Sequence, residues 1–161
     1  MISDISITEI VKLAGISRNT FYLHFSNIFE VLDEITDEVI LNCTAIFVKY
    51  SYKDLLIDCY PLVNELFSLY SNNKYLTDNV LFSPYGNNFI QKFSVAVTKT
   101  VYSSFIPEYG QNYDIEYKIS FVVSGMVGVF YKWIIDNKPI DIELMIQNIS
   151  NHIKFIVQNL I

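Results

Sequence analysis

The chain has 161 residues and a net charge of −6, and 52% of its residues are hydrophobic while only 17% are charged. This length fits one compact domain or one small module joined to a larger one, and the hydrophobic content excludes an intrinsically disordered chain. Five glycines and four prolines are too few for the turns of a many-stranded sandwich or barrel, so an all-α fold is expected.

The sequence also argues against membrane insertion, secretion and disulfide bonding. The longest apolar stretch, residues 121–131, is about half of the roughly 20 residues that a membrane span needs. The first six residues lack the basic region of a secretory signal or transit peptide, so a cytoplasmic protein is expected. Cys43 and Cys59 are far apart with no histidine nearby, which predicts small buried thiols rather than disulfides or a metal site.

Two short helices are predicted near the N-terminus. Ser6 and Glu9 have the spacing of a capping box, which predicts a helix that ends at Gly15. Ser17 is a second N-cap candidate and predicts a helix over residues 18–25. Two short helices joined by about three residues that include a glycine are typical of a helix-turn-helix. The apolar side chains assigned to the core of this module are Ile10, Ala14, Phe21 and Phe25.

A long amphipathic helix over residues 28–50 is predicted to link the module to the rest of the chain, because apolar side chains recur there every three or four positions. The same spacing predicts further helices over residues 56–70, 76–82 and 89–106. Pro61 should kink the first of these by removing a backbone donor, and Pro107 with Gly110 should stop the last.

The last two predicted helices begin at Tyr113 and Asp141. The first, over residues 113–136, carries Gly125 and Gly128 in its middle, which permit the close approach of another backbone. In the second, apolar residues recur at spacings of four and three, which is a heptad stripe. Such a stripe lies either in the core of one chain or in a dimer interface. Its members are Ile142, Ile146, Ile149, Ile153, Ile156 and Leu160.

Acidic side chains concentrate in the first part of the chain. Residues 1–40 hold two basic side chains against seven acidic ones, whereas residues 41–161 hold nine against ten. Neutralisation of phosphates by lysine and arginine supplies much of the affinity of proteins for DNA. An acidic N-terminal part therefore predicts weak non-specific binding to nucleic acid.

Residues 7–25, ITEIVKLAGISRNTFYLHF, resemble the DNA-binding signature of the tetracycline-repressor (TetR) family of transcription regulators. The resemblance lies in an Ala-Gly-Ile-Ser turn, a Thr-Phe-Tyr recognition core, a His-Phe ending, and Val31-Leu32 at the start of the long helix. Residues 121–133 are similar to the penultimate helix of one branch of the family, which includes regulators associated with dihydroxyacetone kinase genes.

The resemblance implies a partial helix-turn-helix DNA-binding domain over residues 1–27 and a helical ligand-binding and dimerisation domain over residues 28–161. It also implies a homodimer that reads a palindromic operator in successive major grooves. Arg18, Asn19 and Thr20 then fall where the recognition helix faces base edges. Tyr22 and His24 fall where side chains reach phosphates. Together with the resemblance, the small residues and the heptad stripe favour a dimer interface built by Gly125, Gly128, Ile142, Ile146, Ile149, Ile153 and Ile156.

Aromatic side chains of the middle helices are candidates for an effector pocket, although each of them also fits plain core. The few ionisable groups in these stretches predict a small apolar or aromatic effector. Neither a cofactor nor a metal is expected, and His24 and His152 lie beside no nucleophile-base pair, so the protein is not expected to be an enzyme. The pocket candidates are Tyr60, Phe67, Phe89, Phe93, Phe121 and Trp133.

Two features depart from the family pattern. The additional N-terminal helix of some 20 residues that family members carry is expected to be absent. Ile28 and Phe29 stand where the family usually places lysine and then glutamate. The first hypothesis is a ligand-responsive repressor that binds its operator as a homodimer. The alternative is a family-derived ligand- or partner-binding protein that has lost operator binding.

Overall fold

The computed structural model describes residues 5–158, which form helices and no strand, so the predicted all-α fold is confirmed. Leu160, the last predicted member of the heptad stripe, lies outside the described residues. The described helices, in chain order, are α1 (Ile7–Ala14), α2 (Arg18–His24), α3 (Ile28–Val48), α4 (Tyr52–Ile57), α5 (Tyr60–Asn72), α6 (Lys74–Leu81), α7 (Gly86–Tyr109), α8 (Tyr113–Ile135) and α9 (Ile142–Val157).

The first two helices begin where the predicted capping residues place them, and the third begins at its predicted residue. The Ser6 hydroxyl accepts a hydrogen bond from the Glu9 N–H while the Glu9 carboxylate accepts one from the Ser6 N–H, which completes the capping box of α1. Gly15 ends α1 in the left-handed region, with φ of 67°. Ser17 caps α2 and Asn27 caps α3 through their side-chain oxygens.

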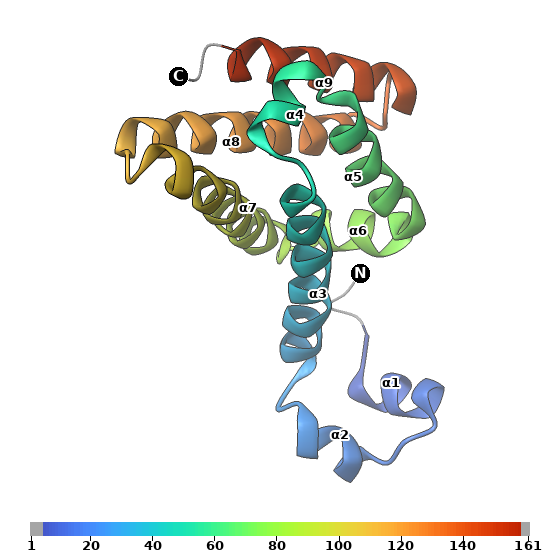
Figure 1. Ribbon diagram of the computed structural model, residues 1–161. Coiled ribbons are helices and arrows are strands. Elements are labelled where there is room, and N and C mark those ends of the chain that lie inside the picture. Colours follow the sequence, from blue (N-terminus) through green and yellow to red (C-terminus); the bar gives the residue numbers. More distant parts are fainter. Residues whose placement is uncertain (1–4, 159–161) are drawn as a thin grey trace.

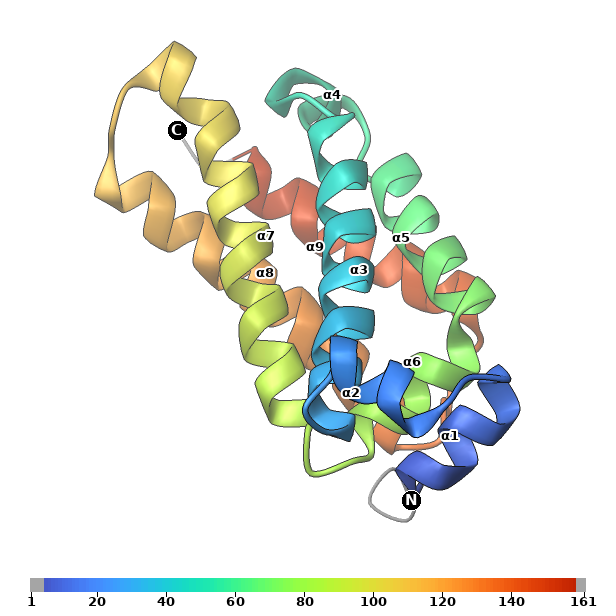
Figure 2. The ribbon, with the colours of Figure 1, turned by 90° about the horizontal axis from the view of Figure 1, so that it is seen from below.

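The long helix α3 joins two unequal parts of the molecule. In Figure 1, α1 and α2 lie beyond the lower end of α3, and the remaining helices lie around its upper part. We call α1 and α2 the N-terminal module and α3 to α9 the body. Seen from below in Figure 2, α3 lies between α7 and α5, with α8 and α9 behind them. The body is thus a layered helical bundle to which the module is joined through one helix.

Two proline residues act differently from the predictions. Pro61 does not kink a helix, because the chain breaks between α4 and α5 and the proline occupies the first turn of α5. A backbone N–H in the first turn of a helix has no intrahelical acceptor, so the proline there costs no hydrogen bond. Pro107 does not stop α7 but lies inside it, and the helix ends at Gly110, where φ is 70°.

The stripe of α9 lies mostly in the core of the body. Ile146, Ile149 and Ile153 are 4%, 5% and 7% exposed and pack in the same cluster as Trp133 and Phe67. These three isoleucines were predicted to form a dimer interface, and the structure shows that their own chain already buries their side chains. A heptad pattern shows that one face of a helix is buried but not which chain buries it.

Helix α8 is long and apolar enough to cross a membrane by length and composition alone. One face of it, formed by Ile115, Ile119, Val123 and Val127, is buried in the body. The opposite face carries Phe121, which is 70% exposed. The helix is therefore a core helix of the body that has a second, uncovered apolar face.

The N-terminal module has a thin core. Among the described residues of α1 and α2, only Val11 and Phe21 are buried, while Leu13 and Leu23 are 90% and 81% exposed. Of the other residues assigned to the core, Ile10 and Phe25 are half-buried and Ala14 is exposed. The module buries few apolar side chains when it folds. Its local opening should therefore cost less free energy than the opening of the body.

We expect the backbone amides of α1 and α2 to exchange with solvent at least about tenfold faster than those of α5 and α8, because local opening exposes little apolar surface. Hydrogen exchange followed by mass spectrometry on the protein without DNA measures this ratio. Equal protection of the module and the body would contradict the thin-core interpretation.

Candidate functional site

Helix α2, which the sequence resemblance predicts to be the recognition helix, presents polar side chains on the outer surface of the module. Arg18 and Asn19, in the first turn of α2, are exposed, and Tyr22 is 49% exposed. Among the described residues, the Arg18 guanidinium donates to the Thr8 hydroxyl at 3.4 Å, a long contact that Arg18 can exchange for another partner. His24 is exposed in the last turn of α2.

Thr20, by contrast, is half-buried and already engaged. Its hydroxyl lies 2.8 Å from the hydroxyl of Ser17, and its N–H donates to the same Ser17 oxygen at 3.0 Å. The side chain therefore supports the start of α2. Of the five residues that the resemblance places at DNA, four are exposed and Thr20 is held within the module.

The acidic excess of the first 40 residues lies on α3 rather than on the module. Over residues 5–27 the charged side chains are Glu9, Lys12 and Arg18, and Glu9 is used in the capping box. Asp33 and Asp37 lie on α3 and pair with a lysine of α7. Their negative charge is thus directed at the body.

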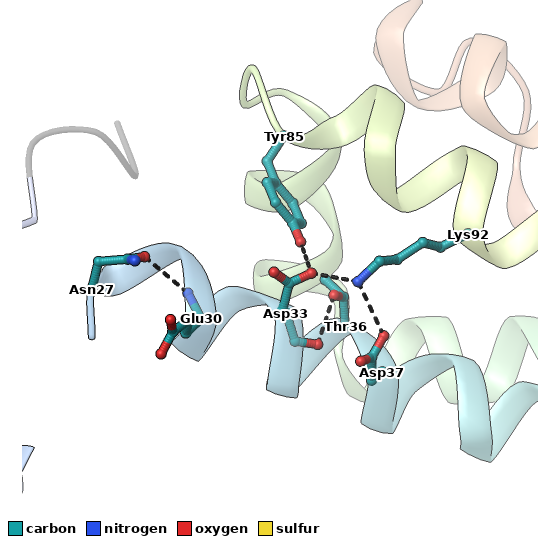
Figure 3. A network of polar contacts seen from close by, with 7 residues as sticks. All are labelled: Asn27, Glu30, Asp33, Thr36, Asp37, Tyr85 and Lys92. Atoms are coloured by element: carbon teal, nitrogen blue, oxygen red, sulfur yellow. Dashed lines mark hydrogen bonds and ion pairs between the residues drawn. The ribbon is translucent and has the colours of Figure 1, made fainter. Parts of the chain in front are cut away.

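A polar cluster fixes α3 to α7 near the module, as Figure 3 shows. The Asp33 carboxylate accepts hydrogen bonds from the Tyr85 hydroxyl and the Lys92 ammonium, and Lys92 also lies 3.5 Å from Asp37. We call these four residues the Asp33 clamp. The hydrogen bonds from Lys92 and then Tyr85 lower the pKa of Asp33, and the same bond to Asp33 raises the pKa of Lys92.

A second polar contact holds the other end of α3. Lys49 and Tyr50, just after the helix, both donate to Glu65 of α5, with the Tyr50 hydroxyl 3.1 Å from the carboxylate. The hydrogen bond from Lys49 lowers the pKa of Glu65. Helix α3 is therefore tied to α7 at one end and to α5 at the other.

An apolar cavity of about 100 Å³ lies between these two ties. Val39 and Cys43 of α3 form one wall, and the other walls come from α5, α6, α7 and α8. Three of the predicted pocket residues, Phe67, Phe89 and Phe93, line this cavity.

The other three predicted pocket residues lie elsewhere. The Tyr60 hydroxyl donates to Glu143 at 3.0 Å, away from the cavity. Phe121 is on the exposed face of α8, roughly opposite its buried residues on the helical wheel. Trp133 is buried in the core and donates through Nε1 to the Ile140 carbonyl at 2.8 Å. Their positions correct the sequence-based assignment.

Two polar side chains of the cavity wall, Tyr70 and Asn73, form hydrogen bonds within the protein. The Tyr70 hydroxyl donates to Asp78 at 2.9 Å, and burial raises the pKa of this tyrosine. The Asn73 amide donates to the Leu69 carbonyl at 3.0 Å. Burial raises the pKa of the Cys43 thiol to about 12, so the thiol is neutral. With no charged side chain among its described lining residues, the cavity fits an uncharged apolar ligand.

Within the described residues, no group of histidine, cysteine, aspartate and glutamate side chains could hold a metal ion. His152 lies exposed on α9, where its Nδ1 is 2.6 Å from the Asn148 carbonyl. The two cysteines are free and buried, as predicted.

The uncovered face of α8 carries several exposed apolar side chains. Tyr117 and Phe121 are 74% and 70% exposed, and Val129 is 50% exposed. A Cβ added at Gly125 or Gly128 would meet nothing within 4 Å in the same chain. The glycines therefore leave open space on the outside of the body rather than admitting a neighbouring helix of their own chain.

Sequence reasoning missed the Asp33 clamp, because its members are 52 and 59 positions apart in the chain. No local pattern marks such a pair. An acidic stretch on the linking helix is the only signal that the sequence offers, and it does not identify Tyr85 or Lys92.

Comparison with known protein families gives one match. Residues 57–155 match a family model described as a transcriptional regulator C-terminal region. The match covers more than half of the chain and includes the Tyr85 and Lys92 side of the clamp, most of the cavity wall and all of α8. The comparison with curated proteins and that with solved structures returned no match.

We expect Asp33→Asn to lower the free energy of unfolding by at most about 1 kcal/mol at pH 7, because the clamp is partly exposed to solvent. The depressed pKa of Asp33 makes this contribution complete above the ordinary value of 3.8, and it is lost as pH falls through the folded-state pKa. Urea unfolding of wild type and variant between pH 2.5 and 7 measures the difference.

The matched control is Glu38→Gln, which removes an exposed acid from the same helix. It should change stability little at any pH. A stability difference for Asp33→Asn that persists unchanged at the lowest pH would contradict the clamp as an ionic contact.

Proposed function

Because the chain belongs to the TetR family of transcriptional regulators, we propose that it binds operator DNA as a cytoplasmic homodimer and that a small apolar molecule in the body controls this binding. The most direct role for such a protein is repression of a target gene. The observation that carries the proposal is the family match over the body, joined by α3 to a module with an exposed Arg18.

Several features support DNA contact by α2. Arg18 and Asn19 project from the first turn of a short helix that lies beyond the end of the body (Figure 1). Arginine and asparagine form the bidentate hydrogen bonds that distinguish guanine and adenine in the major groove. Tyr22 and His24, further along α2, are exposed and suited to phosphate oxygens. Two of the acids on α3, Asp33 and Asp37, pair with Lys92 of α7, which reduces the negative charge that opposes this contact.

The position of the cavity supports control by a ligand. Helix α3 provides wall residues Val39 and Cys43 between its two ties to α5 and α7. A molecule that enters there and separates α3 from α7 acts against the Asp33 clamp. Because α3 leads through Asn27 into the module, the ligand-bound and ligand-free positions of α3 place α2 differently.

The uncovered face of α8 supports dimerisation. Exposed apolar patches on soluble proteins mark interaction sites. Gly125 and Gly128 lie in the middle of this face with open space above them, which lets the same helix of a second copy approach closely. Of the two remaining predicted interface residues on α9, Ile142 is exposed, whereas Ile156 is half-buried and packs against the cluster on the buried side of α8.

The test of operator binding is fluorescence anisotropy with the DNA immediately upstream of the protein's own gene, over a salt series. We expect selective binding whose affinity falls with salt. Arg18→Ala should weaken it by about 10- to 100-fold, as loss of one base contact does. The control Lys99→Ala, at an exposed site of α7, should leave affinity almost unchanged.

Equal loss in both variants would contradict a specific contact by Arg18. Absence of DNA binding by a folded dimer would favour a regulator-derived protein that binds a ligand or partner without reading DNA.

The dimer prediction is tested with Phe121→Glu, which places a charge in the centre of the α8 face. We expect the wild type to be a dimer and the variant a folded monomer by light scattering, because an unpaired charge is not tolerated in an apolar interface. The control Tyr75→Glu, at a side chain of α6 that is 85% exposed, should remain dimeric. An unchanged dimer in Phe121→Glu would contradict this interface.

A further inference from the structure

A second apolar cavity of about 50 Å³ lies beside the one described above. Its wall includes Phe47 of α3, Val101 of α7 and Val123 of α8. Met126 is the residue common to the walls of the two cavities. Met126 is therefore the residue at which the two walls meet.

The two cavities follow one another along the same helices. On α3, Cys43 lines the larger cavity and Phe47 the smaller, a step of four residues or about 6 Å along the helix. On α8 the corresponding residues are Val127 and Val123, again four positions apart. The cavities thus lie end to end along α3, with Met126 at their junction.

The volumes of the two cavities indicate which ligand shape fits them. The larger cavity alone is smaller than the cavity of roughly 150 Å³ that holds one benzene molecule in a protein interior. The two cavities taken together reach about that size. A narrow chain that extends through both uses all of the space, whereas a compact ring system has to displace the wall.

Methionine is well suited to a junction that opens. Its side chain is unbranched, has three rotatable bonds and adapts to irregular gaps. Met126 is only half-buried, so its side chain has room to change rotamer. A β-branched residue at the same place would be stiff at χ1 and would not move aside as readily.

We propose that Met126 is a movable partition and that the effector is an uncharged straight-chain aliphatic molecule that lies along α3 through both cavities. The regulatory meaning of this inference rests on the proposed ligand response of the body. The absence of charged side chains from the described lining of either cavity excludes a buried ionic head group. The polar end of the ligand lies beside Asn73 and Thr77, which are half-buried at the α5–α6 end of the larger cavity.

The test uses 1-alkanols from hexanol to dodecanol, titrated against the full chain without DNA. Trp133 is the single tryptophan of the chain, and its ring centroid is 6.2 Å from that of Phe130 in the cavity wall, so its fluorescence reports binding. In the wild type, each added methylene should tighten binding by about fourfold until the chain fills both cavities. Beyond that length the gain should stop.

Three variants locate the partition. Met126→Ala removes three side-chain heavy atoms, so the longest alkanol that still gains affinity should be about three carbons longer. Met126→Ile keeps nearly the same volume but stiffens the side chain, so the gain should stop at a shorter alkanol. Met145→Ala is the matched control, because Met145 is buried in the core but lines neither cavity, and it should keep the wild-type limit.

If the longest alkanol that still gains affinity is the same for wild type, Met126→Ala and Met126→Ile, Met126 does not act as a partition. Failure of every alkanol to bind the folded wild type overturns the ligand class. Operator affinity is measured separately on the same preparation, so loss of this inference is distinguished from loss of the proposed regulatory function. A shift of the limit in both Met126 variants and not in Met145→Ala supports the inference.

Discussion

The arrangement of this protein depends on one helix that belongs to both of its parts. Helix α3 forms a wall of the cavity through Val39 and Cys43 and then leads through Asn27 into the module. Its packing against α7 is secured by the Asp33 carboxylate, which receives two hydrogen bonds from that side of the body. A change in the spacing of α3 and α7 therefore alters the wall of the cavity and the direction in which α3 leads into α2.

Local chemistry made much of the fold predictable. Ser6, Ser17 and Asn27 each cap a helix through a side chain that bonds a backbone group two or three residues away, so these boundaries could be predicted from short stretches of sequence. Pro61 shows the limit of such reasoning, since a proline fits equally a kinked helix or the first turn of a new one. Only the packing of α4 and α5 on α9 decides between them.

The site was less predictable because its parts come together through tertiary packing. Phe67, Phe89 and Phe93 were predicted as pocket residues and line the cavity, but Trp133 and Phe121 do not. A helical wheel through the buried residues of α8 would have placed Phe121 on the outside. No comparable signal existed for the isoleucines of α9, whose pattern is the same whether their own chain or a second copy buries them.

The two ties on α3 also give the helix the mechanics of a lever. Lys49 and Tyr50 fix it to α5, and Asn27 lies about 33 Å away at the other end, since an α-helix rises 1.5 Å per residue. A tilt of roughly 5° about the fixed end moves the far end by about 3 Å, which is as long as a hydrogen bond. Under the proposed DNA binding, a displacement within the cavity too small to disturb the core is thus magnified into one that takes a side chain of α2 out of bonding distance of a base.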